Sequence, residues 1–379
     1  MYNTQMEKFS LKDQLFNLEK VEKISHEIYT VFPAFQEDVF TQEVVGAFAQ
    51  LELKERITHI CNTLHRYLPS QYDEAIDILL LALPPELDSS KEDDDFGDFI
   101  YAPYGEFVQR YGCNEKNLSL SLRALREVTK RFSVEYAIRD FINTYPDETL
   151  AMLALCAKSD NYHERRLASE GLRPKLPWAK KLTLDYHVPF VLLNQLFSDR
   201  TRYVTRSVAN HLNDVSKIDA PYVIETLKHW QQSKKQNAKE MAFISKHALR
   251  TLVKVGDKDA LALLGFKKNV AVELKTFSLA VQSLCVGETL MFDVHLYAKE
   301  DADVLLDYII HFRTKQGKFS SKVHKFKQLT LEKGESIILR KKHLFKANMS
   351  TRTLYEGEHR IGLQLNGKII ATQHFMLMK

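Results

Sequence analysis

The strongest constraint on the fold is a change in the spacing of apolar residues near position 270. From about residue 10 to 265, apolar residues recur three and four positions apart, as in "DQLFNLEKVEKISHEIYTVF" and "NLSLSLRALREVTKRF", which is the period of an α-helix. Beyond that point the apolar runs are short, often alternating and rich in β-branched and aromatic residues, with turns such as "EKGE" and "NG" between them. The pattern predicts a helical region followed by an all-β region.

Each region has the spacing of a known architecture. Pairs of helices recur roughly every 35–45 residues without strong self-similarity, which is typical of two-helix solenoid repeats. Strands are expected in "VELKTFSLAVQSL", "ETLMFDVHLYA", "DVLLDYIIHF", "ESIILRKKHLF", "HRIGLQLN" and "KIIATQHFML", a spacing that favours a β-sandwich. We therefore expect an α-solenoid over residues 1–268 and a sandwich over residues 269–379.

The composition argues against several classes of protein. No apolar run is long enough to span a membrane, and the N-terminal "MYNTQMEKFSLKDQ" is too polar for a secretory signal peptide. The cysteines are widely scattered, which argues against a zinc cluster or a disulfide framework, and they are Cys61, Cys113, Cys156 and Cys285. Nucleotide-binding glycine loops and nucleophile motifs are absent from the sequence. We expect a cytoplasmic protein without metal or cofactor, and a monomer because no self-association signal is visible.

The net charge of +4 conceals a gradient along the chain. Residues 1–100 carry 8 Lys/Arg against 20 Asp/Glu, whereas residues 271–379 carry 17 against 11. Nine Lys/Arg lie between residues 165 and 206, and residues 313–346 hold 11 Lys/Arg against 2 Glu. Basic charge in two later regions favours a polyanionic partner, although a solvated surface explains the charge alone equally well.

The segment 168–182, "ASEGLRPKLPWAKKL", interrupts the helical region with one glycine and two prolines. We expect a helix over 161–170 that ends at Gly171 in a left-handed cap, because the prolines forbid its continuation. Glu170 would then be exposed at the negative end of the helix dipole, where a carboxylate is disfavoured. It either pairs locally, with Arg166 or Arg173, or has a function.

Two further residues of this part of the chain raise the same question. Trp178 is one of two tryptophans, and we interpret it as an anchor that packs the stiff segment onto the repeats, which is compatible with a role beside a ligand. In the next expected helix, 199–217, Arg206, Asn210 and Asp214 form one polar line, and Asp214 again lies near the helix C-terminus. Two carboxylates at unfavourable helix ends within a basic region indicate a site.

A third carboxylate, Glu135, has a complete structural explanation. Ser133 is a plausible N-cap in "RFSVEYAIRDFI", which would place Glu135 in the first helical turn. The helix dipole favours an anion there. The residue alone therefore indicates a cap more than a site.

These segments together resemble the AlkC family of DNA alkylation-repair glycosylases. The likeness rests on "ASEGLRPKLPWA", with "FSVEYAIRDFI" before it and "YVTRSVANHLNDVSK" after it. In the β region, "DYIIHFRTKQGKFSSKVHKF", "LRKKHLFK" and "STRTLYEGEHRIGLQLNG" are similar to the C-terminal immunoglobulin-like domain of the longer AlkC proteins. The resemblance covers most of residues 100–379, and it departs from the expected pattern at Asp140 and at His324, where a proline and an aromatic residue are common.

The resemblance implies a right-handed α-solenoid of HEAT-like repeats followed by an immunoglobulin-like β-sandwich. It implies a DNA glycosylase that removes cationic N-alkylated bases, 3-methyladenine and also 3-methylcytosine, without full base flipping. Glu135, Glu170, Trp178 and Asp214 fall at or near its active-site positions. Carboxylates suit this chemistry because a cationic base leaves without a strong acid, while the sugar becomes an oxocarbenium-like cation that anions stabilise.

The partner that the resemblance implies is double-stranded DNA with alkylated bases, in the bacterial nucleoid. Phosphate contacts are expected from basic residues of the helical region, namely Arg165, Arg166, Arg173, Lys175, Lys180, Lys181, Arg200, Arg202 and Arg206, with Asn210 as a further candidate. In the β region the expected contacts are Lys322, Lys325, Lys327 and Arg352.

Two other functions remain open from the sequence. Solenoids of this kind are most often protein-binding scaffolds, and the acidic first hundred residues could serve such a partner. A DNA-binding module that has lost catalysis is the second alternative. Release of free base from methylated DNA, without metal or cofactor, separates the enzyme from both.

Overall fold

The computed structural model of the protein describes residues 10–379, except 89, 92, 94–95, 348 and 350–351. Along the chain the helices precede the strands, so the predicted order of a helical region and a β region is confirmed. The α-helices are α1 (Leu11–Leu15), α2 (Leu18–Val31), α3 (Glu37–Gly46), α4 (Leu53–Tyr67), α5 (Tyr72–Leu81), α6 (Ala102–Gly112), α7 (Leu118–Thr129), α8 (Ile138–Thr144), α9 (Pro146–Cys156), α10 (Tyr162–Glu170), α11 (Phe190–Leu196), α12 (Arg202–Val215), α13 (Ala220–Ser233), α14 (Ala238–Ala248), α15 (Arg250–Lys254) and α16 (Lys258–Leu263).

The strands all lie after residue 271, and each borders a turn or loop. They are β1 (Val272–Leu279), β2 (Ser283–Cys285), β3 (Thr289–Ala298), β4 (Ala302–Arg313), β5 (Phe319–Leu331), β6 (Ser336–Leu344), β7 (Gly357–Leu365) and β8 (Lys368–Met378). The chain forms two compact units. The first comprises the described residues up to Val215 together with Trp230–Ala248, and the second comprises Ser216–His229 and Leu249–Lys379.

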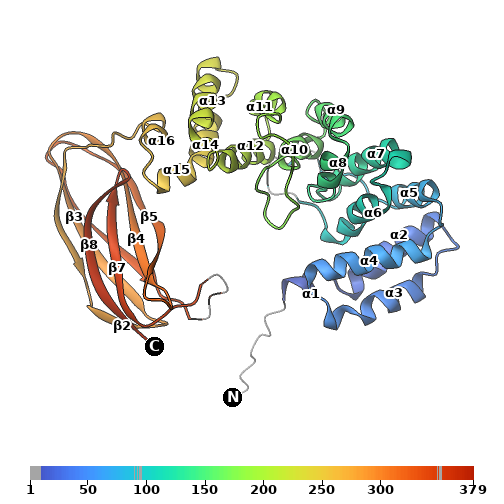
Figure 1. Ribbon diagram of the computed structural model, residues 1–379, viewed down its shortest axis with the longest axis horizontal. Helices are drawn as coiled ribbons and strands as arrows, with labels where there is room; N and C mark the ends of the chain where they lie inside the picture. The colour runs from blue at the N-terminus through green and yellow to red at the C-terminus, as the bar shows by residue number, and fades with distance from the viewer. Residues whose placement is uncertain (1–9, 89, 92, 94–95, 348, 350–351) are drawn as a thin grey trace. The chain divides into compact units, whose positions relative to one another are not determined.

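In the first unit, helices two places apart in chain order pack on each other. α4 packs on α6, α10 on α12, and α12 on α14, and Figure 1 shows α2 to α12 following one another in chain order. α12 buries Val204, Val208, Leu212 and Val215, which share one face because they are three or four residues apart. These residues form the buried apolar face of α12.

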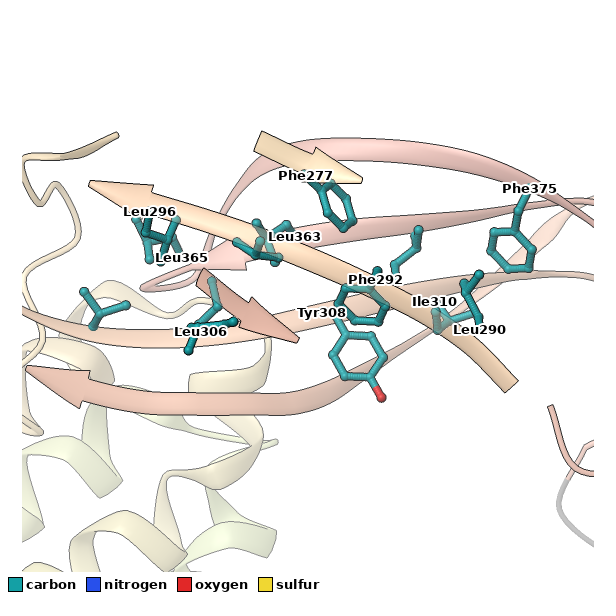
Figure 2. Packing of buried hydrophobic residues seen from close by; sticks show 14 of the residues in the cluster. Phe277, Leu290, Phe292, Leu296, Leu306, Tyr308, Ile310, Leu363, Leu365 and Phe375 are labelled. Atoms are coloured by element: carbon teal, nitrogen blue, oxygen red, sulfur yellow. The ribbon is translucent and has the colours of Figure 1, made fainter. Parts of the chain in front are cut away.

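The second unit contains a sandwich of two sheets. The strand orders are β1-β3-β6 and β2-β8-β7-β4-β5. β3 alternates buried and more exposed residues along its length, as a strand with one buried face does. Phe292 on β3 meets Tyr308 on β4 with ring centres 5.2 Å apart, and Figure 2 shows these rings among the apolar side chains of both sheets.

The sequence pattern did not predict β5, a strand of 13 residues. Its residues are mostly exposed, and three lysines alternate with the partly buried Val323 and Phe326. Among the described residues β5 pairs only with β4, at the edge of its sheet. An edge strand buries little apolar surface and is often protected by lysines, which hides its period.

Helical residues of the second unit pack directly on its sandwich. Leu261 and Phe266 share a small core with Leu305 of β4. The buried Asn366 amide donates to the carbonyls of Lys267 and Asp303 at 2.7 and 3.0 Å. The residues on both sides of position 268 therefore belong to one packed body.

Three observations bear on the classes weighed from composition. All four cysteines are free, so the sandwich has no inter-sheet disulfide. Among the described residues, no helix combines the length and the apolar character that crossing a bilayer requires. Within the same residues, no three His, Cys, Asp or Glu side chains come together as a metal-binding group.

Candidate active site

The three candidate carboxylates are joined by two buried arginines in the first unit. Arg166 on α10 contacts Glu135, with Nη1 and Oε2 3.1 Å apart, and Glu170, with Nη2 and Oε1 3.7 Å apart. Arg173 contacts Glu170 at 2.6 Å and Asp214 at 2.9 Å. We call these five residues the ion-paired network. It brings together residues from three separate parts of the chain.

Glu170 is buried, with 5% of its surface exposed, so the expectation that it is exposed at a helix end is wrong. The alternative of local pairing is confirmed, because Arg173 donates to Oε1. The Ser207 hydroxyl of α12 donates to the other oxygen, Oε2, at 2.6 Å. Burial opposes ionisation, but Arg166 and Arg173 outweigh it and hold the pKa of Glu170 below its ordinary value. Glu170 is therefore a fixed anion.

Asp214 lies one residue before the C-terminus of α12, as predicted, and is 2% exposed. Its carboxylate accepts from Nε of Arg173 at 2.9 Å. The other members of the expected polar line go elsewhere: Asn210 contacts the His247 imidazole, and Arg206 pairs with Asp93. The three residues of the expected line thus bind partners in different parts of the chain.

Glu135 does not lie in the first turn of a helix, because α8 begins at Ile138. Ser133 is not an N-cap either; its hydroxyl is bonded to Glu135 Oε2 and to the Arg166 guanidinium. The explanation of Glu135 as a helix-dipole anion is thus wrong. Its side chain is 13% exposed, compared with 6% for Glu170 and 2% for Asp214. Glu135 is the carboxylate of the network that is most open to solvent.

Aromatic rings support the network from one side. The Arg166 guanidinium lies 4.9 Å from the centre of the Tyr203 ring and 5.8 Å from that of Phe96. Tyr203 is buried, and burial raises the pKa of its phenol, so it stays neutral. These cation–π contacts and the carboxylates together compensate the desolvation of Arg166.

The segment after α10 departs from the expected cap geometry. Gly171 has φ −60° and ψ −31°, an ordinary right-handed conformation, so the predicted left-handed cap is wrong. Glycine is needed there for space, since an added Cβ would lie 2.8 Å from Cγ2 of Ile138. The positive φ, 62°, falls instead on Trp178, where a bulky side chain is strained.

Trp178 is 80% exposed, so its interpretation as an anchor packed on the repeats is wrong. Its backbone is nevertheless held. The Lys54 ammonium of α4 donates to the Trp178 carbonyl at 2.8 Å, and the Tyr136 hydroxyl donates to the Pro177 carbonyl at 3.2 Å. An exposed aromatic ring on a tethered, strained backbone is available to contact a ligand.

Most of the arginines expected to contact phosphates are already used inside the protein. Arg165 is 7% exposed and pairs with Asp199 at 2.6 Å, while Arg166 and Arg173 belong to the ion-paired network. Three others also hold carboxylates, in the pairs Lys180–Asp140, Arg202–Glu240 and Arg206–Asp93. These six side chains hold carboxylates of the protein, although the Lys180 side chain is 64% exposed, and a contact of any of them with DNA stays a prediction.

Six of the seven remaining basic candidates are exposed, and Arg352 is half-buried. Lys175, Lys181 and Arg200 form no ion pair with any carboxylate that the structure describes. The same holds for Lys322, Lys325 and Lys327 on β5. Arg352 instead lies 3.9 Å from the centre of the Phe312 ring. Charge clustering located both basic regions, but it did not separate surface cations from buried ones.

Several residues that hold the site were not predicted, namely Lys54, Tyr136, Arg139, Ser207, Tyr203 and Phe96. The sequence indicates burial of Arg139, because this cation lies in the apolar stripe of α8 beside Ile138 and Phe141, which are both buried. Lys54 carries none, because its partner lies 124 residues later.

Three comparisons with known proteins show what this chain is similar to. A family model described as "Uncharacterised protein YhaZ, C-terminal Ig-like domain" matches residues 273–379. Over 360 residues the chain is 30% identical to the uncharacterised protein YhaZ of Bacillus subtilis (strain 168), which covers 94% of this chain and 96% of that protein. The structure of the present chain is similar to that of the alkylpurine DNA glycosylase AlkC of Pseudomonas fluorescens, bound to DNA containing an abasic site analog, with a TM-score of 0.87. The two sequences are 28% identical, and the match covers 98% of this chain and 100% of that chain.

Proposed function

Because this chain belongs to the family of YhaZ and is an AlkC-like protein with a C-terminal immunoglobulin-like domain, we propose that it is a DNA repair glycosylase. In detail, it hydrolyses the N-glycosidic bond of cationic N-alkylated bases, 3-methyladenine and also 3-methylcytosine, without flipping the base fully from the helix. The observation that carries this proposal is the gathering of Glu135, Glu170 and Asp214 around two buried arginines.

The reaction needs a stabilised cation more than a proton donor. The bond between C1′ and the base nitrogen breaks with its electron pair on the base, and the alkylated base leaves neutral. The positive charge passes to the sugar, and a water oxygen then bonds to C1′ and loses a proton. Carboxylates lower the barrier by stabilising the charge on the sugar, and in the ion-paired network they outnumber the guanidinium groups by three to two.

Exposure and bonding suggest different roles for the carboxylates. Both hydrogen bonds of Glu135 use Oε2, and its Oε1 accepts none from the described residues. We assign Oε1 to the orientation and deprotonation of the attacking water. Both oxygens of Glu170 are occupied, so its part is to supply fixed negative charge. Asp214 acts through Arg173, which it holds against Glu170.

Exposed groups outside the network would bind the DNA. Trp178 would pack against the deoxyribose or the damaged base, a role that its solvent-exposed ring on a tethered backbone supports. Lys175, Lys181 and Arg200 are the phosphate contacts that remain in the helical unit. Lys322, Lys325 and Lys327 are those of the sandwich, and each contact should contribute to a salt-dependent affinity.

A DNA-binding protein without catalysis is the competing function. It is favoured by one observation: each of the three carboxylates has an arginine partner, which is a sufficient structural reason for its presence. The two functions differ in one assay. The enzyme releases free base from methylated duplex DNA without added metal or cofactor, whereas the binding protein forms a complex and releases none.

A further inference from the structure

Arg139, at the start of α8, is a buried cation whose partners are backbone carbonyls. It is 1% exposed. Its Nη1 donates to the carbonyls of Gly171 and Arg173 at 3.0 and 2.9 Å, and its Nε donates to the carbonyl of Lys180 at 2.5 Å. None of these bonds reaches a carboxylate. A buried charge without a counter-ion is costly, and the pKa of Arg139 is lowered to about 10 by burial and by the neighbouring charge of Arg173.

The three carbonyls lie at the two ends of one irregular segment. Gly171 and Arg173 begin it and Lys180 ends it, so a single guanidinium closes the chain between them. This segment carries the positive φ of Trp178. Lys54 and Tyr136 also hold its backbone, but both of those bonds are made at the exposed tip. Arg139 is the buried tether that joins both ends.

Arg139 also connects to the carboxylates through one residue. It binds the backbone carbonyl of Arg173, while the Arg173 side chain binds Glu170 and Asp214. A shift of the Arg173 backbone would therefore move the guanidinium that holds both carboxylates. The geometry of the charged site depends on the same tether as the geometry of Trp178.

We infer that Arg139 is a positioning residue for the proposed glycosylase reaction: it closes the segment Gly171–Lys180, and so fixes both the charged network and the exposed Trp178. The inference rests on the proposed function for its kinetic consequence. Its structural part, that Arg139 closes the segment, stands apart from that function and is tested separately.

The variants are Arg139→Met, which removes the charge, and Arg139→Lys, which keeps it but loses the fork of donors. Arg56→Met is the matched control. Arg56 is 3% exposed at the start of α4, and its guanidinium donates to the backbone carbonyls of Phe16 and Phe48 at 2.8 Å. Unlike Arg139, it also pairs with a carboxylate, that of Asp13 at 2.7 Å, so its loss is at least as severe a change to the fold. It touches nothing in the segment Gly171–Lys180, so it reports the effect of losing a buried arginine as such.

The first readout is brief trypsin treatment of the full-length protein below its unfolding temperature, with cleavage after Lys175, Lys180 and Lys181 followed by mass spectrometry. Loss of the tether opens the segment, so Arg139→Met should be cut there about tenfold faster than the wild type and Arg139→Lys by an intermediate factor. Arg56→Met should be cut there at the wild-type rate. Equal cutting of the wild type and both Arg139 variants would overturn the inference.

The second readout is the single-turnover rate of base release from dimethyl-sulfate-treated DNA at saturating enzyme. Misplacement of the site should lower this rate about 100-fold in Arg139→Met, with little change in Arg56→Met. Faster cutting with an unchanged rate would make Arg139 merely structural and refute its positioning role. If Arg139→Met does not fold, Arg139→Lys decides both readouts. A wild type that releases no base refutes the proposed function, and the trypsin readout still decides whether Arg139 closes the segment.

Discussion

The guanidinium of Arg173 donates from Nε to the Asp214 carboxylate at 2.9 Å, and both side chains are buried. The two residues are 41 positions apart. Their pair ties the segment after α10 to the end of α12. It explains why a carboxylate is retained at the unfavourable end of a helix dipole, since the charge of Arg173 outweighs the dipole.

Asp214→Asn should destabilise the helical unit by about 3 kcal/mol, because it leaves the buried Arg173 with one carboxylate instead of two. Urea unfolding at pH 7 measures this change. The control is Asp293→Asn, which breaks a solvent-exposed pair with Arg340 and should leave the midpoint unchanged. Equal midpoints for the wild type and Asp214→Asn would show that the pair does not hold the segment.

Replacement of Trp178 should separate stability from activity. Its φ of 62° is strained for any side chain but not for glycine, and its ring is exposed. We expect the free energy of unfolding of Trp178→Gly to equal that of Trp178→Ala or to exceed it by up to about 1 kcal/mol. The unfolding temperature of the glycine variant should therefore be the same or higher. Both variants should release methylated base more slowly than the wild type. A glycine variant that is less stable than the alanine variant would contradict the strain, and full activity in both would remove Trp178 from the site.

The sandwich should contribute to DNA affinity through charge alone. The plot of log K against log salt has a negative slope. Changing Lys322, Lys325 and Lys327 together to Gln should make that slope less steep by about 0.9 for each phosphate that these lysines neutralise in the wild type. Binding to a duplex with an abasic-site analogue, measured by fluorescence anisotropy at several salt concentrations, gives the slope. Arg340→Gln is the control, since Arg340 is engaged by Asp293 in the same unit. An unchanged slope in the triple variant would place these lysines outside the interface.

His324 predicts a pH dependence of stability. Burial is the largest cause that lowers its pKa from 6.5 to about 4, and the neighbouring His343, Lys322, Arg352 and Lys254 lower it further. Between pH 4 and 6.5 the unfolded chain binds more protons than the folded one, so the free energy of unfolding falls as the pH drops through this window. Above pH 6.5 His324 is neutral in both states, and the free energy of unfolding no longer depends on it. His324→Phe keeps a ring that can stack on Tyr308 and should reduce the slope of unfolding free energy against pH in that window. Parallel slopes for the variant and the wild type would refute the contribution.

Local periodicity was sufficient to predict the change from helices to strands and the elements within the quoted segments. α10 runs from Tyr162 to Glu170, within the predicted span 161–170, because its start has an Asn cap and its end is followed by glycine and prolines. β5 escaped prediction because, as an exposed edge strand, it has no buried face along most of its length. A pattern of apolar residues reports burial, and it cannot report a strand that is held mainly by its backbone.

The site was predictable only in part, since its contacts are long-range. The unfavourable position of Glu170 correctly drew attention to its pairing with Arg173, three residues away. Its burial depends also on Ser207, 37 residues later. The arginines were expected at the surface because composition does not reveal partners, and Arg139 binds carbonyls that leave no signature in the side-chain sequence. Glu135 was predicted as a site residue only from the resemblance. The first helical turn that the sequence predicted around it is not present in the structure, because α8 begins at Ile138.

The central claim is that the carboxylates of the ion-paired network catalyse base removal, and one measurement tests it most directly. Duplex DNA treated with dimethyl sulfate is incubated with the wild type, Glu135→Gln and Glu170→Gln in the presence of EDTA, and released bases are separated by chromatography. We expect the wild type to release 3-methyladenine, and each variant to lose about 100-fold or more in single-turnover rate while still binding abasic-analogue DNA. Absence of release by the folded wild type, or release at the wild-type rate by both variants, would contradict the claim.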